Sequence, residues 1–383
     1  MKKVKWVINR KESVVTGKRN LKPLYSFKNF PVFMGCVDQK QKKDWVFDMD
    51  WVIDPESGVI QLKKLLPLKL VYQNQHNDGV GKVWDDHYSK FSLFLKWFKP
   101  KNVLEIGAAN GIVANKYLGL DSKVKWTIVE PHPIFKGNKK IKVIKAWFDK
   151  KMAKKVQDSG FDTIIHTHVL EHIYDPQAFL KDINGALKVG DKHIFSLPNM
   201  YEQLRRKYTN CLNFEHTLFL TEEIVDFLLI RSGFRVLKKK YFSEHSIFYS
   251  TEKVTASKKS VIMPHLYKRN LLLFNNFIDY HKSLVEKLNR KIGNAKCPVY
   301  IFGAHIFTQA LFNSGLDEKL IAGVLDNSTQ KQGKRLYGSH FKVESPKRLT
   351  GQNRVYVILK AGAYNAEIKA DILKNINPDV KFL

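Results

Sequence analysis

The sequence predicts an α/β protein with two doubly wound, mostly parallel sheets and a small strand-rich lobe in front of them. Three observations lead to this prediction. The chain has 383 residues, more than a single domain usually contains. Apolar strands alternate with helix-like segments from residue 84 onward, and the alternation starts again after residue 295. Alternating strands and helices favour parallel sheets covered on both faces.

The first segment, residues 1–83, is expected to form the strand-rich lobe. It holds short apolar or alternating stretches, DWVFDMDWVI and GVIQL, which are broken by Pro and Gly. Residues 84–255 are expected to form the first doubly wound domain. It opens with the amphipathic helix HYSKFSLFLKWF and contains a second helix at 176–187. The expected strands are NVLEIG, WTIVEP, KIKVIKAW, FDTIIHTHV, KHIFSLP, RVLKKKYF and SIFYSTE.

Residues 256–294 are expected to connect the two doubly wound domains, because they contain one long helical stretch from about 267 to 290. Residues 295–383 then repeat the strand, glycine turn and helix order in PVYIFGAHIFTQALFNSG, followed by the strands IAGVLDNS and RVYVILKAG and a last helix. This order predicts a smaller Rossmann-like domain.

Composition bounds the class of protein. No apolar run reaches the ~18 residues of a membrane span, and the Lys-rich start lacks the apolar core of a signal peptide, so we expect a cytoplasmic protein. The three cysteines form neither a disulfide framework nor a CxxC zinc site. The net charge of +29 suits an anionic partner, but the Lys residues are dispersed, which favours a solvated surface over a nucleic-acid footprint.

A candidate cofactor site follows the first strand of the central domain. VLEIGAANG places Glu105, Gly107 and Gly111 in the order ExGxxxG, and the next strand ends in Glu130. An acidic residue there can accept hydrogen bonds from both ribose hydroxyls of a nucleoside. A dinucleotide fingerprint reads GxGxxG, whereas Gly107 is followed here by Ala108 and Ala109, so the turn lacks a diphosphate cradle. The alternatives are a helix-packing glycine pair and a solvated strand end.

Two later strings add candidate residues. Phe148 and Asp149 follow the third strand, where Phe148 can stack on an adenine ring and Asp149 can accept its exocyclic amine; a simple turn acid is the alternative. The fourth strand runs into HTHVLEHIYDP, which carries His166, His168, Glu171 and His172. This string matches neither HExxH nor HxxEH, so we expect no catalytic metal there.

These strings resemble class I S-adenosylmethionine (SAM)-dependent methyltransferases, over roughly residues 84–240: LEIGAANG, VEP and VLEHIYDP are close to that family's usual strings. The chain also resembles a narrower group, the nucleotide-sugar C-methyltransferases of deoxysugar biosynthesis. Those enzymes have an N-terminal zinc lobe, a central methyltransferase domain and a C-terminal Rossmann-like domain. The resemblance implies SAM as the cofactor, held by Glu105, Gly107, Ala108, Gly111, Glu130, Phe148, Asp149 and His166.

NFEHTLFLT resembles that group's Tyr-x-Glu-His segment, with Glu215 and His216 on the Glu-His pair. The C-terminal strings FGAHIFTQALFNSG, VLDNSTQKQGKRLYG and ESPKRL resemble its last domain. The chain departs from the group in two places. The four zinc cysteines are absent, although GVIQLKKLLPL resembles the stretch that follows them, and Asn213 stands in place of the Tyr.

Methyl transfer requires a group that removes a proton from the acceptor. His216 is the candidate base, with Glu215 orienting it or polarising the sugar, and a pair of helix-entry residues is the alternative. An enolate would need hydrogen-bond donors, for which His166, His168 and His172 are candidates, with a structural histidine as the alternative for each. Tyr72, His76, His87 and Asn213 are further candidates to surround the acceptor, and Arg205, Arg206 and Lys207 to meet its phosphates.

We therefore expect a SAM-dependent enzyme that methylates a nucleotide-activated sugar for a surface polysaccharide or a deoxysugar product, with carbon favoured over oxygen. The enzymatic alternative is an O-methyltransferase that acts on another phosphorylated sugar or small anion. A nucleic-acid-binding methyltransferase and a non-catalytic SAM-fold scaffold are less favoured. The sequence makes no prediction of the oligomeric state.

Overall fold

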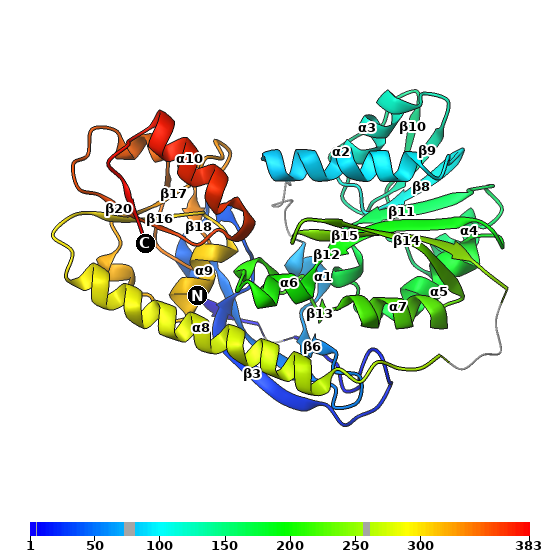
Figure 1. Ribbon diagram of the computed structural model, residues 1–383, viewed down its shortest axis with the longest axis horizontal. Coiled ribbons are helices and arrows are strands. Elements are labelled where there is room, and N and C mark those ends of the chain that lie inside the picture. Colours follow the sequence, from blue (N-terminus) through cyan, green and yellow to red (C-terminus); the bar gives the residue numbers. More distant parts are fainter. Residues whose placement is uncertain (5, 73–80, 256–260) are drawn as a thin grey trace.

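The computed structural model describes residues 1–4, 6–72, 81–255 and 261–383. Figure 1 shows the sheet of the central domain at the right, a second sheet at the left, and a long helix along the lower left of the molecule. The α/β class and the three-part order are as predicted. None of the helices in these residues combines the length and the apolarity that a bilayer crossing requires.

The N-terminal lobe is built on a five-stranded sheet in which β3 and β5 form a long antiparallel pair. Its strands are β1 (Lys2–Lys3), β3 (Lys22–Pro31), β5 (Trp45–Ile53), β6 (Ile60–Leu62) and β13 (Leu218–Phe219). β13 comes from the middle of the chain and pairs with β6 through Leu218 and Gln61. The segment that carries Glu215 and His216 is therefore tied into the N-terminal sheet.

Short elements complete this lobe. β2 (Ile8–Asn9) pairs with β7 (Lys64–Leu65), and the short helix α1 (Leu68–Val71) follows. β4 (Cys36–Val37) pairs with β18 (Arg335–Leu336), so the lobe also shares a small sheet with the C-terminal domain.

The central domain contains a seven-stranded sheet in the order β10-β9-β8-β11-β12-β15-β14, in which only β15 runs antiparallel to the other strands. These strands are β8 (Asn102–Ile106), β9 (Lys125–Val129), β10 (Ile141–Ile144), β11 (Thr163–Thr167), β12 (Lys192–Pro198), β14 (Phe234–Phe242) and β15 (Ser246–Lys253). Most residues of β8, β11 and β12 are buried, as expected for strands that are covered on both faces.

Helices cover both faces of this sheet (Figure 1). α2 (Lys82–Lys96) and α3 (Ile112–Leu120) pack on one face with Phe91 and Val113. On the other face lie α4 (Lys150–Val156), α5 (Pro176–Ala186) and α7 (Glu222–Arg231). α6 (Met200–Arg205) follows β12 and contacts the long helix α8. This layering leaves the carboxyl ends of the parallel strands open for a ligand.

The C-terminal domain has a five-stranded parallel sheet in the order β19-β17-β16-β20-β21. Its elements are β16 (Val299–Phe302), α9 (Ile306–Asn313), β17 (Gly323–Leu325), β19 (Val343–Glu344), β20 (Tyr356–Leu359), α10 (Asn365–Asn375) and β21 (Lys381–Phe382). This sheet agrees with the Rossmann-like domain that the sequence predicts.

The long helix α8 (Tyr267–Gly293) packs against both the N-terminal lobe and the C-terminal domain. Phe274 and Phe277 belong to a hydrophobic cluster that also includes Trp51 of the N-terminal lobe and Val357 of the C-terminal domain. The last turns of the helix instead pack Val285 and other apolar residues into the C-terminal core. The N-terminal lobe and the C-terminal domain consequently share one continuous core.

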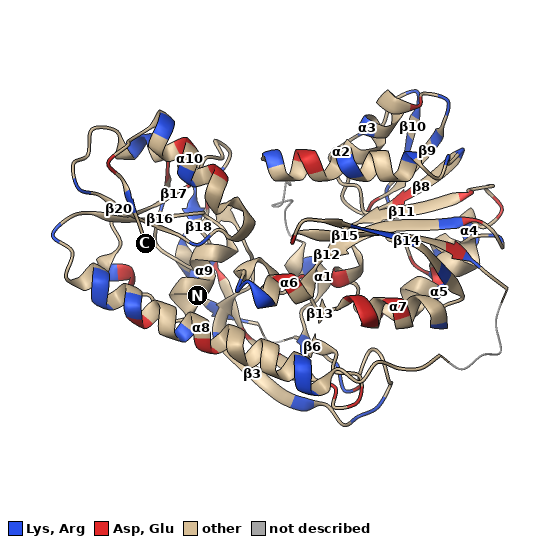
Figure 2. Cartoon of the chain, in the orientation of Figure 1, with Lys and Arg blue, Asp and Glu red and all other residues tan. Residues whose placement is uncertain are grey.

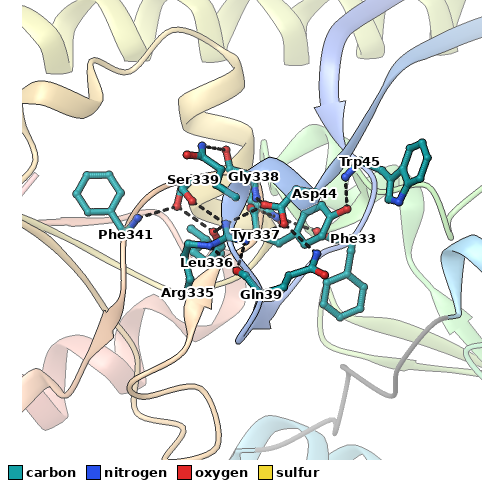
Figure 3. A network of polar contacts seen from close by, with 12 residues as sticks. Phe33, Gln39, Asp44, Trp45, Arg335, Leu336, Tyr337, Gly338, Ser339 and Phe341 are labelled. Atoms are coloured by element: carbon teal, nitrogen blue, oxygen red, sulfur yellow. Dashed lines mark hydrogen bonds and ion pairs between the residues drawn. The ribbon is translucent and has the colours of Figure 1, made fainter. Parts of the chain in front are cut away.

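A polar network fixes the same two parts to each other (Figure 3). Arg335 donates to both carboxylate oxygens of Asp44, at 2.8 and 2.7 Å, and to the carbonyl oxygen of Gln39. The backbone N–H of Gly338 also donates to Asp44. Because Asp44 is fully buried, this network holds the connecting loops of both parts in one arrangement.

Lys and Arg residues are spread over all parts of the chain, with Asp and Glu between them (Figure 2). Several of the ion pairs are exposed, such as Lys18 with Glu56 and Lys28 with Asp48. This distribution favours the solvated-surface interpretation of the net charge.

Candidate active site

A cavity of about 1730 Å³ lies where the three parts of the chain meet. The carboxyl ends of β8, β9 and β11 form one wall, with Gly107, Glu130 and His168. Residues 33–39 of the N-terminal lobe and residues 326–331 of the C-terminal domain form the opposite walls. In doubly wound folds the carboxyl ends of the strands are the usual place for a ligand, and here two such sheets face the same space.

Most of the residues predicted from the sequence line this cavity. They are Tyr72, Glu105, Gly107, Ala108, Glu130, Phe148, Asp149, His168, His172, Asn213, Glu215 and His216. Gly111 lies at the start of α3 and does not line the cavity. His166 and His87 are buried and do not line it either. His76 lies outside the described residues.

The turn after β8 depends on two glycines. Gly107 has φ 75° and Gly111 has φ 64°, both in the left-handed region that side chains disfavour. A Cβ atom on Gly107 would lie 2.7 Å from Cγ2 of Val169, and one on Gly111 would lie 2.8 Å from the ring of Phe135. The ExGxxxG spacing therefore reflects both backbone conformation and close packing around the turn.

Two acidic residues flank this turn. Glu105 is buried and accepts a hydrogen bond from the indole N–H of Trp126 at 2.8 Å. Burial raises the pKa of Glu105 to about 8. Glu130 ends β9, faces the cavity and accepts the backbone N–H of His132 at 2.8 Å. Burial also raises the pKa of Glu130. Glu130 thus presents an acidic side chain to the cavity beside the glycine turn, as the sequence predicted.

Phe148 and Asp149 lie farther along the same wall. The Oδ1 atom of Asp149 accepts the backbone N–H of Met152 at 2.8 Å and so caps α4. Phe148 packs edge-on against Phe179, with ring centroids 6.0 Å apart. Asp149 therefore has a structural role as a helix cap as well as a position on the cavity wall.

The structure does not support the predicted contact of His166 with the cofactor. Its imidazole is fully buried, and its Nε2 atom lies 3.1 Å from Nε2 of His193. Because side chains alternate between the two faces along β11, His166 points toward the face covered by α5, where it meets Phe179. His166 is part of the domain core.

Four polar side chains from three segments, all predicted to lie near the acceptor, meet on one side of the cavity. The hydroxyl oxygen of Tyr72 lies 3.0 Å from Nδ1 of His172, and the same Nδ1 lies 3.6 Å from Oε2 of Glu215. The rings of His172 and His216 meet at right angles, with centroids 4.9 Å apart. We call Tyr72, His172, Glu215 and His216 the acceptor cluster.

Asn213 stabilises the turn that carries Glu215 and His216. Its Oδ1 atom accepts the backbone N–H of Glu215 at 2.8 Å and that of His216 at 2.7 Å. Burial lowers the pKa of His216 well below its ordinary value, so its imidazole is neutral at pH 7. The Nδ1 atom of His216 is buried without a hydrogen-bond partner among the described residues. A neutral imidazole on the cavity wall can accept a proton.

His168 occupies a strained position at the end of β11, with φ 52°. Its Nε2 atom lies 2.9 Å from the hydroxyl of Ser246, and its Nδ1 atom lies 3.3 Å from Oε1 of Glu171. His87, expected near the acceptor, is instead buried on α2 beside His168. The helical period of α2 turns it into the domain, away from the cavity.

Arg205 and Arg206, expected to meet phosphates, pair with Glu202 on the surface and do not line the cavity. The opposite wall contains cavity residues that the sequence did not reveal as such, including Gly303, His305, Lys331, Lys334 and Tyr337. The strand ends in FGAH and VLDNS were the signal that could have identified this wall, because a second Rossmann-like sheet has its own ligand edge.

Two known protein families match the chain, one over the central domain and one over the C-terminal domain. Residues 77–239 match a methyltransferase domain, and residues 254–383 match a C-methyltransferase C-terminal domain. The protein is a SAM-dependent methyltransferase. SAM is therefore the cofactor of this methyltransferase, as the resemblance implied. No curated protein matches its sequence significantly.

Several solved structures of methyltransferases resemble part of the chain. An O-methyltransferase family protein from Burkholderia thailandensis is 8% identical, with a TM-score of 0.37; the match covers 45% of the methyltransferase and 57% of that chain. A 1,6-didemethyltoxoflavin-N1-methyltransferase from the same organism, solved with S-adenosylhomocysteine, is 16% identical, with a TM-score of 0.35, covering 45% and 82%. A SAM-dependent methyltransferase from Aquifex aeolicus is 19% identical, with a TM-score of 0.34, covering 43% and 89%.

Proposed function

We propose that this methyltransferase adds a methyl group to a carbon atom of a nucleotide-activated ketosugar, in the biosynthesis of a deoxysugar or a surface polysaccharide. The observation that carries the proposal is the acceptor cluster, which places a neutral His216 beside Glu215, His172 and Tyr72 on the wall of the shared cavity. This arrangement offers a proton acceptor and hydrogen-bond donors at one point.

The size of the cavity supports two ligands. Pockets for one small molecule usually measure about 300–1,000 Å³, and this cavity measures about 1730 Å³. The wall with Gly107, Glu130 and Phe148 suits SAM, because Glu130 can accept from a ribose diol and Phe148 can stack on adenine. The remaining space lies against the C-terminal domain and suits a second, large ligand.

The C-terminal wall has the charge that a nucleotide diphosphate requires. Lys331 and Lys334 both line the cavity beyond the end of β17. Lys331 pairs with Asp326 at 3.1 Å, which holds its ammonium group at this edge. Ammonium groups form charge-assisted hydrogen bonds with phosphate oxygens. We assign the nucleotide part of the acceptor to this wall and the sugar to the acceptor cluster.

When SAM is bound, it supplies an electrophilic methyl group. His216 removes the proton from the carbon next to the sugar carbonyl, and the resulting carbanion, stabilised as an enolate, is the nucleophile. The hydroxyl of Tyr72 and the imidazole of His172 donate hydrogen bonds to the enolate oxygen. Glu215 stabilises the imidazolium that His216 becomes. Tyr72 thus brings a phenol to the cluster although Asn213 stands where related enzymes have a Tyr.

The proposal is tested with nucleotide ketosugars and ¹³C-methyl SAM. We expect the labelled methyl group on carbon in the NMR spectrum of the product. In D₂O with S-adenosylhomocysteine in place of SAM, the wild type should still exchange the proton next to the carbonyl. His216→Gln should slow this exchange by about 10²–10⁴-fold. His193→Gln is the matched control, because His193 is a buried imidazole outside the cavity.

One departure from the related enzymes favours an alternative, O-methylation. Asn213 replaces the Tyr that accompanies the Glu-His pair in nucleotide-sugar C-methyltransferases. In this alternative His216 removes a proton from a sugar hydroxyl, so the labelled methyl group appears on oxygen and no carbon-bound proton exchanges. That result would overturn the carbon assignment while leaving His216 as the base.

A further inference from the structure

Three histidines that are far apart in the sequence meet beside the cavity. His87 comes from α2, His168 from the end of β11, and His245 from the turn between β14 and β15. One ring nitrogen of each lies within 4.8 Å of the others. We propose that His87, His168 and His245 bind one divalent transition-metal ion of the zinc class in a structural site.

The spacing of the rings fits metal coordination. The ring centroids lie 5.2, 5.6 and 5.5 Å apart for the three pairs. Imidazoles whose nitrogens lie about 2 Å from a tetrahedral ion have ring centroids about 5 Å apart. Packed aromatic rings also lie about 4.5–7 Å apart, so the spacing permits an ion, and the surroundings of the three rings argue for one.

His87 gives an independent reason to place an ion here. Its side chain is fully buried, and neither Nδ1 nor Nε2 has a hydrogen-bond partner among the described residues. A buried polar group without a partner is costly and calls for an unseen ligand, such as a water molecule or an ion. Burial also lowers the pKa of all three imidazoles, which keeps them in the neutral form that binds metals.

The surroundings have the features of an outer coordination shell. Glu171 lies 3.3 Å from Nδ1 of His168, the carboxylate–histidine arrangement that orients metal-bound imidazoles. The hydroxyl of Ser246 lies 2.9 Å from Nε2 of His168 and 2.5 Å from Nδ1 of His245, so it stands at the open side of the group. The indole of Trp84 contacts all three rings and excludes solvent.

A second group of possible ligands, Glu171, His172 and His216, also contains buried atoms without a hydrogen-bond partner, but His172 and His216 belong to the acceptor cluster, where an ion would compete with the proposed reaction. Nδ1 of His172 is already engaged by Tyr72 and lies near Glu215, while Nε2 of His172 lies 3.9 Å from Oε1 of Glu171. The ion is therefore assigned to the three histidines. It would connect α2 and the β14–β15 turn to the loop that carries Glu171 and His172, next to the acceptor cluster.

The test uses the full chain, purified with a histidine-free tag. We expect inductively coupled plasma mass spectrometry to find about one zinc-class ion per chain. After removal of the ion by a chelator, Co²⁺ should restore the visible absorption of a four-coordinate site. His245→Gln should weaken Co²⁺ binding at least ~100-fold, which exceeds the effect of losing most outer-shell partners. His87→Phe, which keeps a ring of similar shape, should do the same.

Two controls make the result decisive. His193→Gln removes another buried imidazole and should leave Co²⁺ binding unchanged. His172→Gln tests the other group, and selective loss of binding in this variant would overturn the assignment. A wild-type protein that binds neither Zn²⁺ nor Co²⁺ would also overturn it. None of these measurements depends on methyl transfer, so they stand apart from the proposed acceptor.

Discussion

Arg335 of the C-terminal domain and Asp44 of the N-terminal lobe form a buried two-pronged ion pair, with nitrogen–oxygen distances of 2.8 and 2.7 Å. Asp44 also accepts the backbone N–H of Gly338 and the side-chain amide of Gln39. Gln39 and the neighbouring Tyr337 both line the cavity. The pair therefore joins two walls of the cavity.

Loss of this pair is expected to destabilise the protein strongly. Arg335→Met leaves a buried carboxylate without its partner and should lower the free energy of unfolding by about 3–5 kcal/mol. Urea denaturation measures this change. Lys18→Met, which breaks the exposed pair with Glu56, should cost at most about 1 kcal/mol. Equal losses in the two variants would show that the Asp44 pair does not fix the lobes.

Asn213 is expected to support catalysis through the backbone. Asn213→Ala removes the acceptor for the N–H groups of Glu215 and His216, so both side chains should lose their orientation and kcat should fall by roughly 10–100-fold. Asn213→Asp keeps an oxygen at the same place and should retain most of the rate. Steady-state kinetics of the two variants separates this role from direct contact with the sugar, which would make both variants equally poor.

The pH dependence of the rate follows from the burial of His216. The base must be neutral, and burial lowers its pKa well below 6.5. Activity should therefore persist as the pH falls through 6.5 and disappear only below that value, when His216 becomes protonated. A profile of kcat/KM against pH measures this limb. A half-maximal rate at pH 6.5 or above would indicate a different base.

Glu105 is expected to make stability depend on pH. Its pKa rises from 4.5 to about 8 on folding, so between these values the unfolded chain releases a proton that the folded chain keeps. The free energy of unfolding should consequently fall with rising pH, by up to about 1.4 kcal/mol per pH unit from this group. Glu105→Gln can still accept from Trp126 and should lack this dependence. Urea denaturation at pH 5 and pH 8 compares the two proteins; parallel curves would contradict the assignment.

Glu130 is expected to determine the affinity for SAM. Glu130→Ala removes the only acidic side chain at the end of β9, and with it the acceptor for the ribose hydroxyls. Calorimetry should show a loss of at least ~10-fold in SAM affinity, since hydrogen bonds to charged groups contribute about 1.5–3 kcal/mol. Glu367→Ala, on the C-terminal wall of the same cavity, should leave SAM affinity unchanged.

Sequence patterns alone were enough to predict the fold class and the cofactor. Local patterns were sufficient because a strand, a glycine turn and a helix are contiguous in the chain, and the turn at Gly107 requires its backbone conformation whatever surrounds it. The same locality identified the segment of Glu215 and His216. It also predicted one long helix from about 267 to 290, which the structure shows as α8 (Tyr267–Gly293).

The contacts between side chains from distant segments could be seen only in the tertiary structure. A sequence string does not show on which face of a strand His166 lies, and the alternation of β11 turned it into the core. The contacts of Tyr72 with His172, of Asp44 with Arg335, and of His87 with His168 and His245 join segments that are distant in the chain. Such contacts depend on how the sheets and helices pack around shared cores, which local periodicity does not encode.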